Sequence, residues 1–255
     1  MAGRTSAVAA VVILLVAASA DAAWTVTASE TETSATGAAE HRHITLTSDT
    51  GDDATVDVAL FSTKSANVRV IDNPGRDNLA AVIGRMAGIA GVNGGYFDPQ
   101  DVPVGLVVAD GKLLAPFRKA RLLSGVLIAD KTRIELLRSA EYSSRKNMMT
   151  ALQCGPFLVD RRAAVPGLNA VNSARRTFVL TTGSDRVGIG SCSPVSLAEL
   201  GEILATPRFL TDVKVQRALN LDGGSSSAFW FAGENGVTSM SEYKTVRNFV
   251  VVTPK

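Results

Sequence analysis

The stretch that best indicates the fold and the chemistry of this chain is Asn220-Leu221-Asp222-Gly223-Gly224-Ser225-Ser226-Ser227. A β-type lead-in from Val215 ends in one carboxylate, which is followed by two glycines and three hydroxyl side chains. Glycines lack the Cβ atom that would keep a ligand away from the backbone. The run therefore predicts a carboxylate beside exposed N–H and hydroxyl donors, which suits an anionic or sugar-like ligand. A tight turn between two strands is the alternative, because Asp-Gly is a common hairpin signal.

A second run has the same order of residue types. Gly91-Val92-Asn93-Gly94-Gly95-Tyr96-Phe97-Asp98 has an apolar lead-in, a polar side chain, two glycines and then aromatic residues. This recurrence favours a shared site over an isolated turn. Further segments in the same part of the chain are Val104–Lys112, Gln153–Val159, Ala174–Val179, Ser196–Leu200 and Val246–Val252.

These segments, in this order, resemble the phosphodiester glycosidase family, and the resemblance spans roughly Gly88 to Val252. It implies an enzyme that cleaves the bond between the anomeric carbon of a sugar and a phosphodiester. The family pattern places an arginine directly before a threonine, which selects Arg176 over Arg175. Ser225 stands where the family often has a third glycine, and Asp98 is not general to the family.

The resemblance implies roles for individual residues. Asp222 would be the general base or nucleophile, Asn93 would hold substrate through its amide, and Arg176 and Arg247 would bind phosphate. The alternatives are a turn-capping aspartate, a turn residue before glycine, and structural ion pairs. The remaining substrate-binding candidates are Gly94, Gly95, Gly223, Gly224, Ser225, Ser226 and Asp98.

The residue types fit hydrolysis of a sugar 1-phosphodiester. Glycosidases usually use two carboxylates, but a phosphate monoester is already a weakly basic leaving group. One carboxylate with cationic stabilisation of the phosphate could therefore be sufficient. No cofactor is required by the sequence. Asp222, Asp98 and Asn93 carry the hard oxygen ligands that Ca²⁺ or Mg²⁺ accepts, although no spacing of a known metal loop is present.

Several chemistries are excluded or disfavoured. The chain has no Gly-x-Ser-x-Gly elbow and no phosphate-binding Walker loop. Its only histidines, His41 and His43, lie far in sequence from the motifs and are too few for a three-histidine zinc site. Two rival functions remain open: a non-catalytic envelope module that binds anionic glycan, and a phosphodiesterase that cuts the P–O bond.

Composition sets the broad class. The chain has 255 residues, of which 46% are hydrophobic, and a net charge of +2. This is enough apolar sequence for one sizeable core, and the balanced charge gives no electrostatic case for a nucleic-acid partner. We expect one catalytic domain over residues 41–255, with a sugar phosphodiester or glycan as its partner.

The N-terminus is typical of a secretory signal peptide over residues 1–22. Arg4 supplies the positive charge, Ala7–Ala18 is apolar, and small-x-small cleavage sites follow. Export to the periplasm or the extracellular space is the expectation, with no membrane span after cleavage; an uncleaved anchor is the alternative. Residues 23–40 are rich in Thr, Ser, Ala and Glu, which predicts a flexible lead-in.

The two cysteines, Cys154 and Cys192, form a plausible disulfide in an exported protein. The alternative is a pair of buried thiols.

Strand patterns dominate the chain. Alternating or β-branched runs predict strands at Thr55–Ser62 and Asn67–Ile71, and a hairpin joins Thr177–Thr182 to Val187–Ile189. Apolar spacing predicts a helix over Asn78–Met86 capped by Asp77, and Ser196 and Glu199 form a capping-box pattern for a second helix that Pro207 ends. These elements predict an α+β fold: a mostly antiparallel or mixed sheet with a few packed helices.

Overall fold

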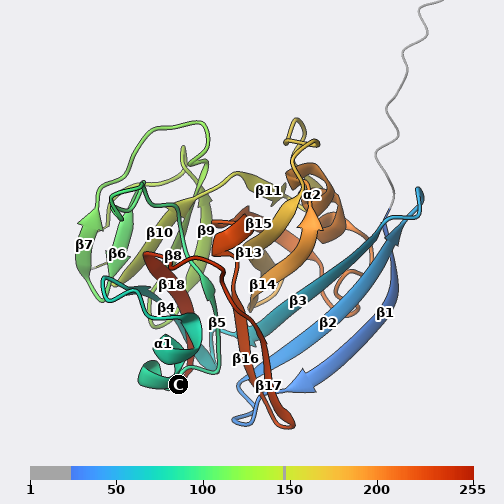
Figure 1. The fold of residues 1–255 in the computed structure, drawn as a ribbon, viewed down its shortest axis with the longest axis horizontal. Helices are drawn as coiled ribbons and strands as arrows, with labels where there is room; N and C mark the ends of the chain where they lie inside the picture. The colour runs from blue at the N-terminus through green and yellow to red at the C-terminus, as the bar shows by residue number, and fades with distance from the viewer. Residues whose placement is uncertain (1–23, 146–147) are drawn as a thin grey trace, which may run out of the picture.

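The computed structural model describes residues 24–145 and 148–255, so the predicted signal peptide lies outside the described residues. The strands form three sheets (Figure 1). The eight-stranded sheet has the order β1 (Trp24–Thr33), β2 (Ala39–Ser48), β3 (Asp53–Ser62), β14 (Arg186–Val195), β13 (Ala174–Thr182), β15 (Val215–Asn220), β11 (Phe157–Asp160), β12 (Ala163–Ala164).

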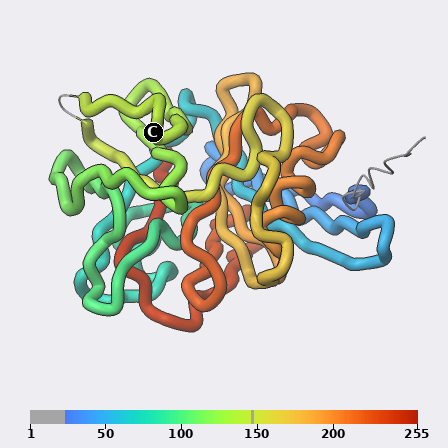
Figure 2. The backbone as a smooth tube through the Cα atoms, turned by 90° about the horizontal axis from the view of Figure 1, so that it is seen from above, coloured from blue at the N-terminus to red at the C-terminus, as the bar shows by residue number. Residues whose placement is uncertain are grey.

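The two five-stranded sheets complete the fold. One has the order β7 (Lys112–Ala115), β6 (Val107–Ala109), β10 (Thr150–Cys154), β8 (Gly125–Ala129), β9 (Ile134–Arg138); the other has the order β17 (Gly236–Met240), β16 (Phe229–Gly233), β5 (Ala90–Asn93), β18 (Asn248–Pro254), β4 (Ala66–Asp72). The N-terminal strands and the β6–β10 sheet lie at opposite ends of the molecule (Figures 1 and 2).

The fold is largely β. All paired strands of the described residues run antiparallel, and two α-helices accompany them in this part of the chain. The expected antiparallel sheet is thus observed, including the β13–β14 hairpin, while the helical share of the predicted α+β class is small. No described helix has the length and apolar character needed to span a bilayer.

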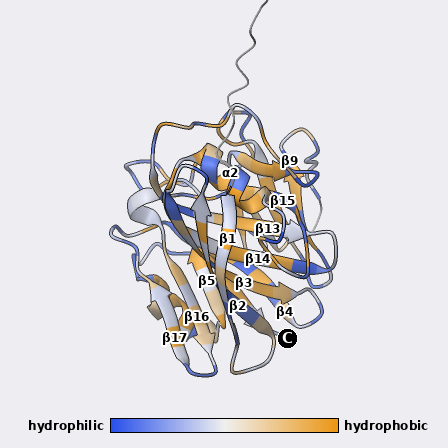
Figure 3. Ribbon diagram, turned by 90° about the vertical axis from the view of Figure 1, so that its right-hand side faces the viewer, coloured by the Kyte–Doolittle hydropathy of each residue, from blue (hydrophilic) through white to orange (hydrophobic). Residues whose placement is uncertain are grey.

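Alternate side chains of the large sheet point into two different hydrophobic cores, one on each face of the sheet. In β3, Val56, Val58 and Leu60 face the layer that contains α2 (Leu197–Ala205), whereas Phe61 faces a central core shared by all three sheets. Because successive side chains of a strand point to opposite faces, a nearly continuous apolar run indicates burial on both sides. The strands that are largely orange in Figure 3, such as β13 and β15, lie between these two layers.

Strand β18 is also buried on both faces. Val250 and Val252 enter the central core, while Phe249 and Val251 pack with α1 (Leu79–Met86) on the other face. This double burial anchors the C-terminal motif segment, which begins β18 with the buried residue Asn248.

The two helices begin close to where the sequence predicts. For α2 the capping box is present: the Ser196 hydroxyl accepts from the Glu199 N–H at 3.2 Å, and the Glu199 carboxylate accepts from the Ser196 N–H at 2.7 Å. For α1 the predicted cap was one residue early. Asn78, not Asp77, accepts from the Ala81 N–H at 2.9 Å.

The expected flexible lead-in is wrong for most of its length. Residues Trp24–Thr33 form β1, which pairs with β2 across nearly its whole length. Trp24 is buried in the core layer that contains α2, while most other β1 side chains are exposed. A polar edge strand carries little apolar periodicity, so composition alone does not distinguish it from a flexible segment.

The predicted disulfide is also wrong: Cys154 and Cys192 are both free and buried. Cys154 belongs to the central core, whereas Cys192 belongs to the layer that contains α2. The thiols therefore sit in two separate core layers. Burial raises the pKa of each thiol to about 12, which keeps both protonated and chemically inert at neutral pH.

Candidate active site

The two glycine-pair runs meet where the large sheet adjoins the sheet that contains β5. Gly94 follows the end of β5, and its carbonyl accepts from the Asp222 N–H at 3.0 Å. The Asn93 amide nitrogen donates to the Asp222 carbonyl at 2.7 Å. Two motifs separated by 129 residues are thereby joined by a direct pair of hydrogen bonds.

Asn93 is the central support of this junction. Its side-chain oxygen accepts from the Thr177 hydroxyl at 2.7 Å and from the Ala228 N–H at 3.0 Å, and the residue is 0% exposed. Thr177 belongs to the Arg176-Thr177 motif in β13 (the Arg-Thr motif). Ala228 directly follows Gly223–Ser227, which we call the glycine-serine run. Asn93 therefore ties three motif segments together, and its amide is engaged with protein groups.

The contacts of Asn248 explain why glycines stand at positions 94 and 95. Its backbone carbonyl accepts from the Gly94 N–H and its side-chain oxygen accepts from the Gly95 N–H, both at 2.8 Å. A Cβ atom at Gly94 would lie 1.9 Å from that side-chain oxygen. Glycine is needed here because the C-terminal motif packs directly on the backbone.

Asp222 lies at the turn between β15 and the 3₁₀ segment Gly224–Ser226. Its Oδ1 accepts from the Gly223 N–H at 2.9 Å, and the Ser226 side chain also donates to the carboxylate. Burial raises the pKa of this carboxyl, and the two hydrogen bonds offset part of that effect. A partly buried carboxylate whose charge costs desolvation is well suited to proton transfer or nucleophilic attack.

Arg176 approaches the same turn from β13. Its Nε donates to the Val195 carbonyl at 2.8 Å, and its Nη2 donates to the Asn172 carbonyl. A Cβ atom placed at Gly223 would be 3.9 Å from Arg176 Nη1. Burial lowers the pKa of the guanidinium. Two carbonyls thus fix the fork beside Gly223, with no ion-pair carboxylate among the described residues.

The phosphodiester glycosidase family profile matches residues 87–253. The chain belongs to the phosphodiester glycosidase family. This confirms the resemblance that the separated motifs predict, and it covers the segments that form the junction around Asn93 and Asp222. No curated protein matches the sequence.

Solved structures share the fold. A hypothetical protein from Synechocystis has a TM-score of 0.66 at 13% identity, with 86% of this chain and 62% of that chain covered. The zebrafish N-acetylglucosamine-1-phosphodiester α-N-acetylglucosaminidase catalytic domain, auto-inhibited by its pro-peptide, has a TM-score of 0.61 at 14% identity, with 89% and 88% covered. A Burkholderia pseudomallei protein described as exported has a TM-score of 0.50 at 13% identity, with 79% and 74% covered.

Two of the candidate residues have side chains that are engaged by other protein groups. Arg247 forms an ion pair with Asp72, with Nη1 2.7 Å from Oδ1, which matches the structural alternative for this arginine. The Asp98 carboxylate accepts from the Gln100 and Val102 N–H groups, both at 2.9 Å, and so organises its own turn.

The donor set does not fit a metal. Among the described residues, no group of three or more His, Cys, Asp or Glu side chains could hold an ion. The side-chain oxygen of Asn93 is occupied by Thr177 and Ala228, and Asp98 caps a turn. The trio of Asp222, Asp98 and Asn93 is therefore not arranged as a cation site.

Sequence reasoning missed Tyr96 and Asn220 as parts of this cluster. The Tyr96 hydroxyl donates to the Gly155 carbonyl at 2.5 Å, and the Asn220 amide donates to the same carbonyl at 3.0 Å. Burial, with the charges of Cys154 and Asp222, raises the pKa of Tyr96. Tyr96 therefore stays protonated beside the carboxylate. Both residues stand inside the two glycine runs, which is the only sequence signal for them.

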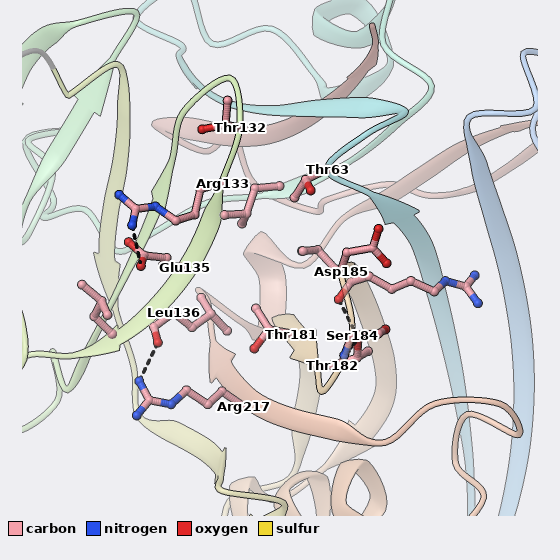
Figure 4. A pocket seen from close by; sticks show the side chains of 14 residues that line it. Thr63, Thr132, Arg133, Glu135, Leu136, Thr181, Thr182, Ser184, Asp185 and Arg217 are labelled. Atoms are coloured by element: carbon pink, nitrogen blue, oxygen red, sulfur yellow. Dashed lines mark hydrogen bonds and ion pairs between the residues drawn. The ribbon is translucent and has the colours of Figure 1, made fainter.

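A separate cavity of about 430 Å³ lies away from this cluster (Figure 4). Its lining comes from β9, from the β13–β14 hairpin and from Arg217, and it contains none of the candidate site residues. The arginines at its wall are paired: Arg217 with Glu141, Arg133 with Glu135, and Arg186 with Asp212. This cavity is therefore not the position of the family motifs.

The environment of Asp222 predicts a pH-dependent stability effect. Because its pKa is raised on folding, stability linked to this group is fully present below the unfolded value, near 3.8, and is lost as pH rises through the folded value. At neutral pH the ionised carboxylate therefore lowers the free energy of unfolding. We expect the Asp222→Asn protein to melt a few degrees above wild type at neutral pH.

Thermal melts across the acidic-to-neutral range measure this effect. The advantage of the Asp222→Asn variant should shrink as pH falls, because wild-type Asp222 becomes neutral as well. Equal melting temperatures at every pH would show that the carboxylate is fully solvated in the folded protein.

Proposed function

We propose that the protein is an exported hydrolase that cleaves the glycosidic bond of a sugar 1-phosphodiester, releasing free sugar and a phosphomonoester. Membership of the phosphodiester glycosidase family supports this reaction type. The signal-peptide pattern over residues 1–22 supports export.

One observation carries the proposal most directly. The partly buried carboxylate of Asp222 accepts from the Gly223 N–H, and Arg176 Nη1 lies 3.9 Å from where a Cβ atom of the same glycine would stand. Arg176 is fixed by the carbonyls of Val195 and Asn172, and no acidic side chain within residues 24–145 and 148–255 forms an ion pair with it. A positive charge fixed in this way, without a carboxylate partner, is well prepared for an anionic ligand.

The chemistry follows from these positions. Asp222, ionised, would accept a proton from water that attacks the anomeric carbon, or would attack that carbon itself to form an intermediate that water then hydrolyses. The bond between the anomeric carbon and the phosphate oxygen breaks, and its electron pair leaves with the phosphomonoester. Arg176 Nη1 would stabilise the charge on the departing phosphate, so that the leaving group needs little protonation.

Product identity tests this assignment. Mature protein is incubated with UDP-N-acetylglucosamine and with N-acetylglucosamine 1-(methyl phosphate), and the products are separated. Free sugar is expected. Sugar 1-phosphate would instead show cleavage of the P–O bond, and binding without any turnover would show a glycan-binding module.

Arg176→Lys should lower the rate of sugar release by about tenfold, since a point charge cannot donate to the two carbonyls and to phosphate together. Arg247→Lys is the matched control, because Arg247 is already paired with Asp72. We expect the control to change thermal stability more than turnover. If Arg247→Lys loses more activity than Arg176→Lys, Arg247 is the phosphate-binding arginine and Arg176 is structural.

A further inference from the structure

An exposed aromatic ring stands next to the Asp222 turn. Tyr243 is 80% exposed, in a chain with only 5% aromatic residues. Its backbone N–H donates to the Ser225 carbonyl at 2.8 Å, and the Lys244 N–H donates to the same carbonyl at 3.1 Å. The segment that carries this ring is therefore attached directly to the glycine-serine run.

Arg175 fixes the ring from one side. Its guanidinium carbon lies 3.9 Å from the centroid of the Tyr243 ring. The same guanidinium donates to the Gly224 carbonyl through Nε at 3.3 Å and to the Ser241 carbonyl through Nη1 at 3.2 Å. One face of the ring is therefore covered by the Arg175 guanidinium, which is held on the Asp222 turn. The high exposure of Tyr243 leaves the opposite face of the ring open to solvent.

This arrangement is costly if it has no ligand. An exposed ring forgoes the apolar burial that usually places tyrosine in a core or an interface, and an exposed cation–π contact offsets only a small part of that loss. A rigid aromatic face beside donor groups is, in contrast, what a ring-shaped ligand with an apolar face requires, because little entropy is lost when it binds.

We propose that Tyr243 is the stacking platform for the pyranose ring of the substrate, and that Arg175 is the residue that positions it. The C–H groups of a hexose would pack on the open face of the ring, while the sugar 1-phosphate end extends toward Asp222 and Arg176. The proposal rests on the function proposed above and adds the residue that binds the sugar. It also gives a role to Arg175, which the Arg-Thr motif leaves unassigned.

Binding to a catalytically impaired protein tests the platform independently of turnover. In an Asp222→Asn background, calorimetric titration with N-acetylglucosamine 1-(methyl phosphate) and with glucose 1-(methyl phosphate) should show about tenfold weaker binding after Tyr243→Ala, a loss typical of one aromatic stack. Tyr243→Phe should bind normally because the ring face is retained. Leu113→Ala, at a residue 61% exposed on β7, is the control for truncating a surface side chain.

Kinetics in the otherwise wild-type enzyme give a second readout. Tyr243→Ala should raise KM with little change in kcat, the signature of a contact made equally in the ground and transition states. Equal loss in Tyr243→Phe and Tyr243→Ala would assign the effect to the hydroxyl group and overturn stacking. Unchanged binding in Tyr243→Ala, or no binding of either probe to the Asp222→Asn parent, would overturn the platform.

The hydrolase proposal and the Tyr243 platform proposal would fail in experimentally different ways. If wild-type protein releases no sugar but Tyr243→Ala still weakens probe binding, the platform stands and the hydrolase assignment fails. If sugar is released at the same KM with and without the ring, the hydrolase stands and the platform fails.

Discussion

The Asp222→Asn protein should release sugar at least about a hundredfold more slowly than wild type, the lower end of the loss expected when a general base is removed. Asparagine keeps the size of the side chain and the oxygen that accepts from the Gly223 N–H. It removes only the charge. Because the change leaves the Asn93 and Gly94 contacts to the Asp222 backbone in place, the fold should be retained.

Release of reducing sugar from N-acetylglucosamine 1-(methyl phosphate) measures the effect, with thermal melting as the control for folding. Asp98→Asn is a matched variant, since Asp98 lies in the other glycine run but caps its own turn. It should keep most of the activity. Near-normal turnover in a well-folded Asp222→Asn protein would remove Asp222 from the mechanism and leave the Gly-Gly run as a turn.

Asn93→Ala should produce the largest loss of stability among single changes at the site. The variant loses the hydrogen bonds to the Asp222 carbonyl, the Thr177 hydroxyl and the Ala228 N–H, and leaves these groups without their partner. Unpaired buried groups cost about 1–3 kcal/mol each, so a total near 3 kcal/mol is expected after partial relaxation. In a chain of this size that corresponds to a fall of about 6–12 °C in Tm.

Asn235→Ala is the matched control, because Asn235 is exposed in the turn between β16 and β17. It should melt like wild type. The opposite pattern at Asn93, unchanged melting with lost activity, would mean that its amide contacts substrate, as the glycine-run motif suggested.

Much of the fold could be predicted from local patterns. The β13–β14 hairpin and the capping box at Ser196 depend on residues close in sequence, and both are present. The polar β1 was missed because its exposed face has no apolar periodicity; the strand exists because it pairs with β2 and buries Trp24 at its start. Pairing between strands is a long-range property that composition does not encode.

The disulfide was predicted wrongly for a similar reason: it depends on how distant segments are placed in the fold. The expectation of export makes a bond between Cys154 and Cys192 reasonable, but bond formation needs the two Cβ atoms within a few ångströms. The strands that carry these residues place one thiol in the central core and the other in the layer that contains α2. The two thiols do not form a bond because their side chains face different core layers.

The sequence by itself determined the family, the positions of the two glycine runs, and the identity of the polar side chains that follow the strands. These features depend only on the order of residues along the chain and not on how it folds. Only the tertiary structure decided what each side chain does: Asn93 is a buried support, Arg247 is paired with Asp72, and Arg176 is held by two backbone carbonyls. The physical reason is that burial and pairing depend on groups brought together from distant segments, as Asn93 and Asp222 are across 129 residues.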